Sequence, residues 1–100
     1  MSELSFIWDD DKNQLNQNKH DGIDFDEAKT VFYDDQARVI FDPKHSSNED
    51  RFIILGLSNK LRLLIVCHCY RELDSTIRLI SARKATKQEA ETYEKKRDAK

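Results

Sequence analysis

Basic side chains that could hold phosphate groups gather in the second half of this 100-residue chain. Between Arg51 and Lys87 there are eight lysines and arginines but two acids. Arginine suits a phosphate because its planar, permanently charged fork matches two phosphate oxygens. The first 50 residues are the reverse, with five basic side chains against thirteen acidic ones. The net charge of −2 therefore conceals a basic surface beside an acidic one.

Lysine and histidine side chains near the N-terminus could supply proton transfers. Cleavage of RNA without a metal uses the 2′-hydroxyl of the RNA as nucleophile. It needs a base, an acid for the leaving 5′-oxygen and cations for the extra negative charge. Lys19 and His20 are of the types that serve as base or acid. Lys12, Asn16 and Lys19 also share one face of an expected helix. A solvated helix face is the alternative explanation of that spacing.

Other catalytic chemistries have little support in the sequence. His20, His45 and His68 are far apart, and the spacing of Cys67 and Cys69 around His68 is not that of a zinc site. The chain has two glycines and no phosphate-cradling loop, and it has no nucleophile elbow. We therefore expect no metal and no cofactor, a half-buried His68 with satisfied hydrogen bonds, and a solvated His45.

The sequence is typical of a reduced, cytoplasmic protein. No apolar run approaches the roughly 18 residues of a membrane span. The N-terminus lacks the basic and then apolar regions of a signal peptide. Cys67 and Cys69 point to the same face of an expected strand, where they are poorly placed to form a disulfide with each other.

The elements that must position these groups are expected in the order β-α-α-β-β-β-β-α. Hydrophobic patterns and capping boxes predict strands at 4–8, 37–42, 51–58, 62–71 and 75–83, and helices at 9–20, at 24–35 and from 87 onward. The last four strands should pair as antiparallel neighbours, because their connections are too short for helical crossovers. The sequence thus predicts a single α+β domain over residues 1–100. Two N-terminal helices would pack on one face of a curved antiparallel sheet, and the tail would fray after about residue 94.

Strand alternation over 75–83 predicts where its arginines point. It places Ile77, Leu79, Ser81 and Arg83 on one face of the strand and Arg78, Ile80 and Ala82 on the other face. Ile77 and Leu79 would line the core, and Arg83 would leave it at the strand end. A surface ion pair is an equally open explanation of Arg83.

Three segments resemble the BrnT family of bacterial toxins: WDDDKNQLNQNKH…GIDFDEAKTVFYDD, DPKHS…RFIILGLS and IRLISARKATKQEAETYE. The resemblance spans Trp8 to Tyr93, and ISARKA with the downstream Glu and Tyr is its most specific part. It implies a RelE-like fold and a ribonuclease activity that arrests translation. It also implies a cognate ribbon-helix-helix antitoxin, BrnA, which binds operator DNA and represses the shared operon.

The resemblance also suggests roles for individual residues. Lys19 or His20 would transfer protons, and Arg83 would stabilise the phosphorane. The expected RNA contacts are Lys12, Arg62, Arg71, Arg78 and Lys84. Two positions depart from the family pattern. Asp21 interrupts the run Lys-His-Gly, which would turn Lys19 and His20 by about 100° relative to the helix cap, and Leu61 stands where the family often has Gly.

Three functions remain open on this basis. The first is a metal-independent endoribonuclease that cleaves mRNA, free or on the ribosome, and is neutralised by its antitoxin. The second is a catalytically inactive antitoxin-binding partner that acts in operon autoregulation, which the Asp21 insertion and the acidic first half favour. The third is a general RNA-binding module, which the scarcity of exposed aromatic residues on the strands disfavours.

Overall fold

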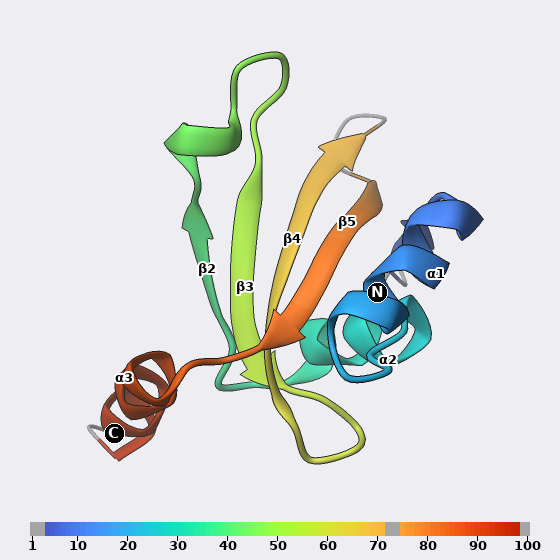
Figure 1. Cartoon of the computed structure of the whole chain (residues 1–100). Helices are drawn as coiled ribbons and strands as arrows, with labels where there is room; N and C mark the ends of the chain where they lie inside the picture. Colours follow the sequence, from blue (N-terminus) through green and yellow to red (C-terminus); the bar gives the residue numbers. More distant parts are fainter. Residues whose placement is uncertain (1–3, 72–74, 99–100) are drawn as a thin grey trace.

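Five strands form one mixed sheet in the order β1-β5-β4-β3-β2. Figure 1 labels the last four of these strands. The computed structural model of the chain describes residues 4–71 and 75–98. The strands are β1 (Ser5–Ile7), β2 (Arg38–Phe41), β3 (Phe52–Leu57), β4 (Leu63–Arg71) and β5 (Thr76–Lys84). The helices are α1 (Asp10–Lys19), α2 (Phe25–Thr30) and α3 (Lys87–Asp98), with short 3-10 turns η1 (Val31–Tyr33) and η2 (Pro43–His45). The predicted α+β fold and the predicted order of elements are confirmed.

The strand pairing is antiparallel from β2 to β5, as predicted from the short connections. Strand β1 instead runs parallel to β5, so the sheet is mixed rather than wholly antiparallel. The chain between β1 and β5 contains two helices and three strands, which is ample for a parallel connection. Because β1 pairs only with residues Thr76 to Arg78, the second half of β5 has no strand beside it on that edge.

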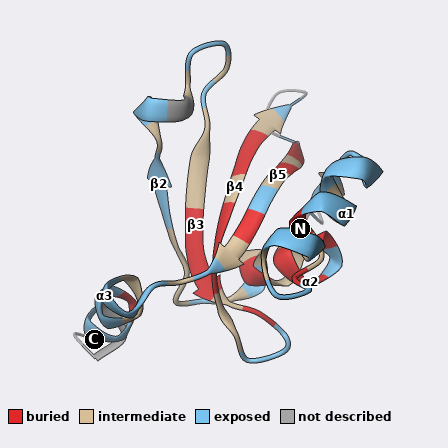
Figure 2. Cartoon of the chain, viewed as in Figure 1, coloured by how far each residue is buried: buried red, intermediate tan, exposed pale blue. Residues whose placement is uncertain are grey.

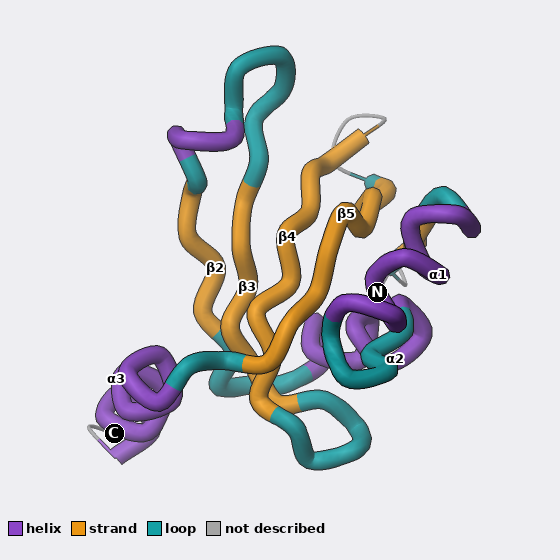
Figure 3. Tube along the Cα trace, in the orientation of Figure 1, coloured by secondary structure: helices purple, strands orange, loops and turns teal. Residues whose placement is uncertain are grey.

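The core lies between one face of the sheet and the helical segment formed by α2 and η1. Its buried members come from the connection between α1 and α2, from α2, η1 and the three central strands, and Figure 2 shows the same concentration of buried residues. They are Ile23, Phe25, Ala28, Val31, Ile54, Leu64, Val66, Ile77, Leu79 and Ala82. Strand β2 and helix α1 are mostly exposed (Figure 2). The connection from β2 to β3 contains η2 and extends beyond the sheet (Figure 3).

Helix α3 stands apart from α1 and α2 (Figure 1) and packs on the opposite face of the sheet. Its anchor is Tyr93, which is buried against Leu55 and Ile65. The Tyr93 hydroxyl donates to Asp34 Oδ2 at 2.7 Å. The helix continues to Asp98, beyond the point where we expected fraying, and no Gly or Pro interrupts it. Among the described residues, no helix is long and apolar enough to span a membrane.

A β-bulge at Ile80 interrupts the alternation of β5. Cys67 pairs with Ser81 and the next residue, His68, pairs with Leu79, so Ile80 has no partner in β4. A bulge of this kind places one extra residue on one strand and reverses the side-chain alternation beyond it.

The bulge makes part of the predicted alternation wrong. Leu79 faces the core as expected, but Ala82 is also buried in the same core cluster. Ser81 and Arg83 therefore lie on the opposite, open face together with Arg78. The prediction failed because it assumed an uninterrupted period of two along the strand.

Candidate active site

Helix α1 is held against β5 by a buried asparagine rather than by an apolar stripe. The side-chain amide of Asn16 donates to Ala82 O at 2.8 Å and to Ile23 O at 2.9 Å. Its oxygen accepts from the Ala82 N–H at 2.9 Å. The side chain thus satisfies the backbone of β5 where no strand is available. Lys12 and Lys19 are exposed on the same helix, whereas Asn16 is buried, so the three residues do not form one solvated face.

A hollow of about 180 Å³, here called the helix hollow, lies between α1 and the bulge of β5. It is lined by Lys12, Leu15, Asn16, Lys19, His20, Ile80 and Ser81. The three titratable residues that the sequence placed near the N-terminus therefore come together, and they do so against the open-face side of β5.

A second hollow of about 320 Å³, the sheet hollow, lies on the open face of β3, β4 and β5. It is lined by Phe41, Asp42, Arg51, Ile53, Ile65, Cys67, Ile80, Ser81 and Arg83. The two hollows share Ile80 and Ser81. The hollow lined by Lys19 and His20 therefore adjoins the hollow lined by Arg83 at the bulge.

Sequence reasoning missed Arg51 and the bulge itself. Arg51, Ile53 and Leu55 alternate at the start of β3, which would have placed Arg51 on the open face. Nothing in the local sequence signals the bulge, because Ile80 has the residue type of an ordinary strand position.

Arg83 is held in place by a carboxylate from α3. Its Nη1 and Nη2 donate to the two Glu89 oxygens at 2.9 and 3.0 Å, and Nη1 also donates to Lys84 O at 3.2 Å. Glu89 Oε1 accepts in addition from the Thr86 N–H at 2.8 Å, and the Thr86 hydroxyl accepts from the Glu89 N–H, which confirms the predicted capping box. The hydrogen bonds from Arg83 lower the pKa of Glu89 to about 2, and those to Glu89 raise the pKa of Arg83. The Arg83 side chain is still 41% exposed, so it forms the expected ion pair and also faces solvent.

Three other predicted RNA contacts are paired with acids of the same chain. Glu49 accepts from Arg71 at 3.1 Å and from Arg78 at 3.2 Å. Lys84 Nζ lies 3.5 Å from Asp21 Oδ2. Each of these partners is partly exposed, so the pairs are accessible to a competing phosphate.

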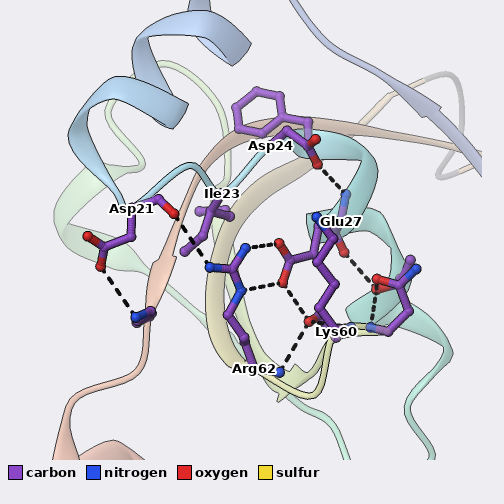
Figure 4. A network of polar contacts seen from close by, with 12 residues as sticks. Asp21, Ile23, Asp24, Glu27, Lys60 and Arg62 are labelled. Atoms are coloured by element: carbon purple, nitrogen blue, oxygen red, sulfur yellow. Dashed lines mark hydrogen bonds and ion pairs between the residues drawn. The ribbon is translucent and has the colours of Figure 1, made fainter.

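Arg62 belongs to a structural ion pair at the turn between β3 and β4 (Figure 4). Its Nε donates to Glu27 Oε2 at 2.9 Å and its Nη2 to Glu27 Oε1, while the Ser58 hydroxyl donates to Glu27 Oε2 at 2.7 Å. Burial raises the pKa of Glu27, but the hydrogen bonds from Arg62 and Ser58 outweigh it and the pKa lies below its usual value. The fork of Arg62 is committed to the fold and lines neither hollow. An RNA contact by Arg62 would require this pair with Glu27 to open.

The inserted Asp21 is accommodated by a left-handed backbone. Its φ is 54°, that of Gly22 is 75°, and the Gly22 N–H closes the end of α1 on Gln17 O at 2.9 Å. The insertion therefore leaves Lys19 and His20 on the helix hollow. Leu61, which stands where the family often has Gly, is likewise left-handed with φ of 60°, a conformation that costs a branched residue about 1 kcal/mol.

His68 has a structural role, as predicted. It is fully buried, its Nδ1 lies 3.1 Å from Val66 O, and its Nε2 lies 3.3 Å from the Tyr70 hydroxyl. Burial lowers the pKa of His68, which keeps the ring neutral. The prediction for the side chain of His45 lies outside the described residues. Within the described part of the chain, no three His, Cys, Asp or Glu side chains gather in a group that could hold a metal ion.

Residues 8–89 match the family model described as "Ribonuclease toxin, BrnT, of type II toxin-antitoxin system". The chain belongs to this family.

A solved relative supports the same assignment. The chain is similar to the ribonuclease toxin BrnT of Brucella abortus, known from a crystal structure at 1.1 Å resolution. The two are 25% identical with a TM-score of 0.63, and the similarity covers 85% of this chain and 100% of the other. A search of curated protein sequences finds no match.

Proposed function

We propose that this chain is a metal-independent endoribonuclease that cleaves mRNA in the cytoplasm and thereby inhibits translation. The observation that carries the proposal is the bulge of β5, at which two adjoining hollows share Ile80 and Ser81. Lys19 and His20 line one hollow and Arg83 lines the other. A base, an acid and a permanent cation therefore border the same surface.

The proposed reaction follows from these three groups. Lys19 or His20 removes the proton of an RNA 2′-hydroxyl, and the oxygen bonds to the adjacent phosphorus. The bond from phosphorus to the 5′-oxygen breaks, and the other of the two residues protonates that oxygen. Arg83 holds the extra negative charge of the phosphorane, and Glu89 keeps its fork in place. The products are a 2′,3′-cyclic phosphate and a 5′-hydroxyl.

The remaining basic residues would guide the RNA backbone to this surface. Lys12 lines the helix hollow and is exposed. Arg71, Arg78 and Lys84 would exchange their partners Glu49 and Asp21 for phosphates. Such contacts are electrostatic, so RNA affinity should fall steeply with salt.

The proposed partner is a BrnA-type ribbon-helix-helix antitoxin. We propose that acidic residues of this antitoxin cover the hollows, so that neutralisation is occlusion of the basic surface. Operator DNA would be contacted through the antitoxin alone. A structure of the complex in which Arg83 stays uncovered would contradict occlusion.

A second candidate function is a catalytically inactive, antitoxin-binding partner in operon autoregulation. The observation that favours it is the pairing of Arg62, Arg71, Arg78, Arg83 and Lys84 with carboxylates of the same chain. If these pairs do not open, the solvent-facing part of Arg83 is all that β5 offers to a phosphate.

A cleavage assay in EDTA separates the two functions. An end-labelled mRNA is incubated with the wild type, with a Lys19→Ala, Arg83→Ala double variant, and with a Lys29→Ala, Lys60→Ala control. The control removes one partly exposed and one exposed lysine, both outside the two hollows. Discrete cleavage by the wild type and the control, but not by the catalytic double variant, is the expected result. Intact RNA with all three proteins, with and without added ribosomes, would favour the inactive partner.

A further inference from the structure

Arg51 carries a buried hydrogen-bond donor that has no acceptor. Among the described residues, its Nε is the buried side-chain polar atom without a hydrogen-bond partner. Both backbone polar groups of Arg51 are hydrogen-bonded. Its N–H donates to the Ser46 hydroxyl at 2.9 Å, and its carbonyl accepts from the Asp42 N–H at 2.8 Å. A buried donor without an acceptor is unfavourable, and in native structures it is uncommon. Its position on the sheet hollow suggests that a ligand supplies the acceptor.

The lining of the sheet hollow has a cationic part and an apolar part. Arg51 and Arg83 are its two guanidinium groups, Asp42 adds one carboxylate, and Ser81 adds a hydroxyl, so cations outnumber acids in the lining. Its apolar lining is Phe41, Ile53, Ile65 and Ile80. A ligand that suits both parts combines an anion with a flat apolar group.

The sheet register fixes how these parts are arranged. Ile53 pairs with Cys67, and Cys67 pairs with Ser81, so the three form one row across β3, β4 and β5. Arg51 directly precedes β3 and lies two positions before Ile53, and Arg83 follows Ser81 by two positions on β5; both line the hollow on the open face. Cys67 therefore lies in the middle strand of the hollow, between the two arginine-bearing strands.

We infer that the sheet hollow binds one nucleotide of single-stranded RNA, with its phosphate on Arg51 and Arg83 and its base against the apolar lining. The inference rests on the proposed function for the choice of RNA as ligand, and it assigns Arg51 as a binding residue of that site. The Nε–H of Arg51 gains the phosphate oxygen that it lacks in the free protein. The base contacts the isoleucines of the lining, because the ring of Phe41 packs against Phe52 on the other face of the sheet.

Cys67 gives a direct probe of occupancy that does not depend on cleavage. It is partly exposed on the hollow, whereas Cys69 is buried, so a thiol reagent should label Cys67. Burial raises the pKa of the Cys67 thiol, so the labelling is done at alkaline pH. A Cys67→Ser variant identifies the labelled position by mass spectrometry.

The experiment measures the rate of Cys67 labelling with and without a hexanucleotide whose 2′-O-methyl groups prevent cleavage. Saturating oligonucleotide should slow labelling at least fivefold, and inorganic phosphate at the same concentration should not. Arg51→Gln should weaken oligonucleotide binding about tenfold and remove the protection. Lys29→Gln, which removes a charge on α2 outside the hollow, should leave the oligonucleotide affinity and the protection of Cys67 unchanged.

Two results would overturn the inference. In one, the oligonucleotide binds, but it does not slow the labelling of Cys67, and the Arg51→Gln variant binds it as tightly as the wild type does. The RNA would then lie elsewhere on the protein. The other is equal protection by inorganic phosphate, since no base would then be bound. The cleavage assay in EDTA is independent of both results, so an active enzyme without protection of Cys67 would retain the proposed function and reject this subsite.

Discussion

At the scale of single residues, carboxylates of the same chain hold the basic groups before any ligand arrives. Glu49 bridges Arg71 and Arg78, and Glu89 forms two hydrogen bonds with Arg83. A carboxylate and a phosphate present similar oxygens to a guanidinium. These acids therefore orient the cations and also compete with RNA for them.

Glu49→Gln should strengthen RNA binding, because Arg71 and Arg78 would lose their competing carboxylate. We expect affinity to rise about threefold to tenfold, and the dependence of log K on log salt to steepen by about 0.7 for each new phosphate contact. Fluorescence anisotropy at several salt concentrations measures both quantities. Glu91→Gln, an equal charge change on the exposed side of α3, should leave the affinity nearly unchanged. Unchanged binding by Glu49→Gln would mean that these arginines do not contact RNA.

Glu89 should make stability depend on pH in the acid range. Its pKa is about 2 in the folded protein against an ordinary value of 4.5. A lowered pKa means that the carboxylate stabilises the fold fully above pH 4.5 and loses this effect as the pH falls toward about 2. Wild type should exceed Glu89→Gln by about 1 kcal/mol at neutral pH, since solvent screens a partly exposed pair. Urea unfolding at several pH values should show this difference vanishing in acid. If the stability difference between the wild type and Glu89→Gln does not change with pH, the lowered pKa of Glu89 would be contradicted.

At the scale of elements, the placement of α1 depends on one buried side chain. α1 has few apolar residues, and Asn16 ties it to both Ile23 and the unpaired edge of β5. Lys12 and Lys19 are carried on the same helix. The geometry of the helix hollow is therefore set by an amide rather than by hydrophobic packing.

Asn16→Ala should destabilise the protein and loosen α1. The substitution leaves the Ala82 N–H and two carbonyls without their partner, which should cost about 2–4 kcal/mol in the free energy of unfolding. Hydrogen exchange of the α1 amides should accelerate at the same time. Asn18→Ala, an exposed change on the same helix, should stay within about 0.5 kcal/mol of the wild type. Equal exchange rates in the two variants would show that α1 is held by other contacts.

At the scale of the whole molecule, the η1 segment and the sheet approach each other closely at Gly56. A Cβ placed on Gly56 would lie 2.8 Å from Val31 Cγ1 and 2.9 Å from Ala37 Cβ. Nearby, Asp34 accepts hydrogen bonds from the Leu57 N–H and the Tyr93 hydroxyl. This region therefore connects η1, β3 and α3, and through α3 it supports Arg83.

Gly56→Ala should separate these layers and destabilise the fold by about 1–3 kcal/mol, because the added methyl group has no room. Thermal or urea unfolding measures the loss. Adding Ala37→Gly should recover part of it when the double variant is compared with Ala37→Gly alone, since one of the two closest methyl groups is then absent. A Gly56→Ala protein as stable as the wild type would show that the layers adjust freely.

The sequence alone was enough to predict the order of elements, the antiparallel pairing of the last four strands and the capping box of α3. Each depends on local information, namely hydrophobic period, short connections and cap residues such as Thr86 and Glu89. The residues expected to do chemistry, Lys19, His20 and Arg83, were also found from residue type and family resemblance. Their roles remain a proposal.

The tertiary structure decided which of these residues meet. Pairing across β4 and β5 places a bulge at Ile80, which turns Arg83 to the open face and joins the two hollows. Contacts between distant segments assign Arg62 to Glu27 and leave the Nε of Arg51 without an acceptor. Strand register and ion-pair partners arise from segments far apart in the chain, so no pattern within a single segment could have predicted them.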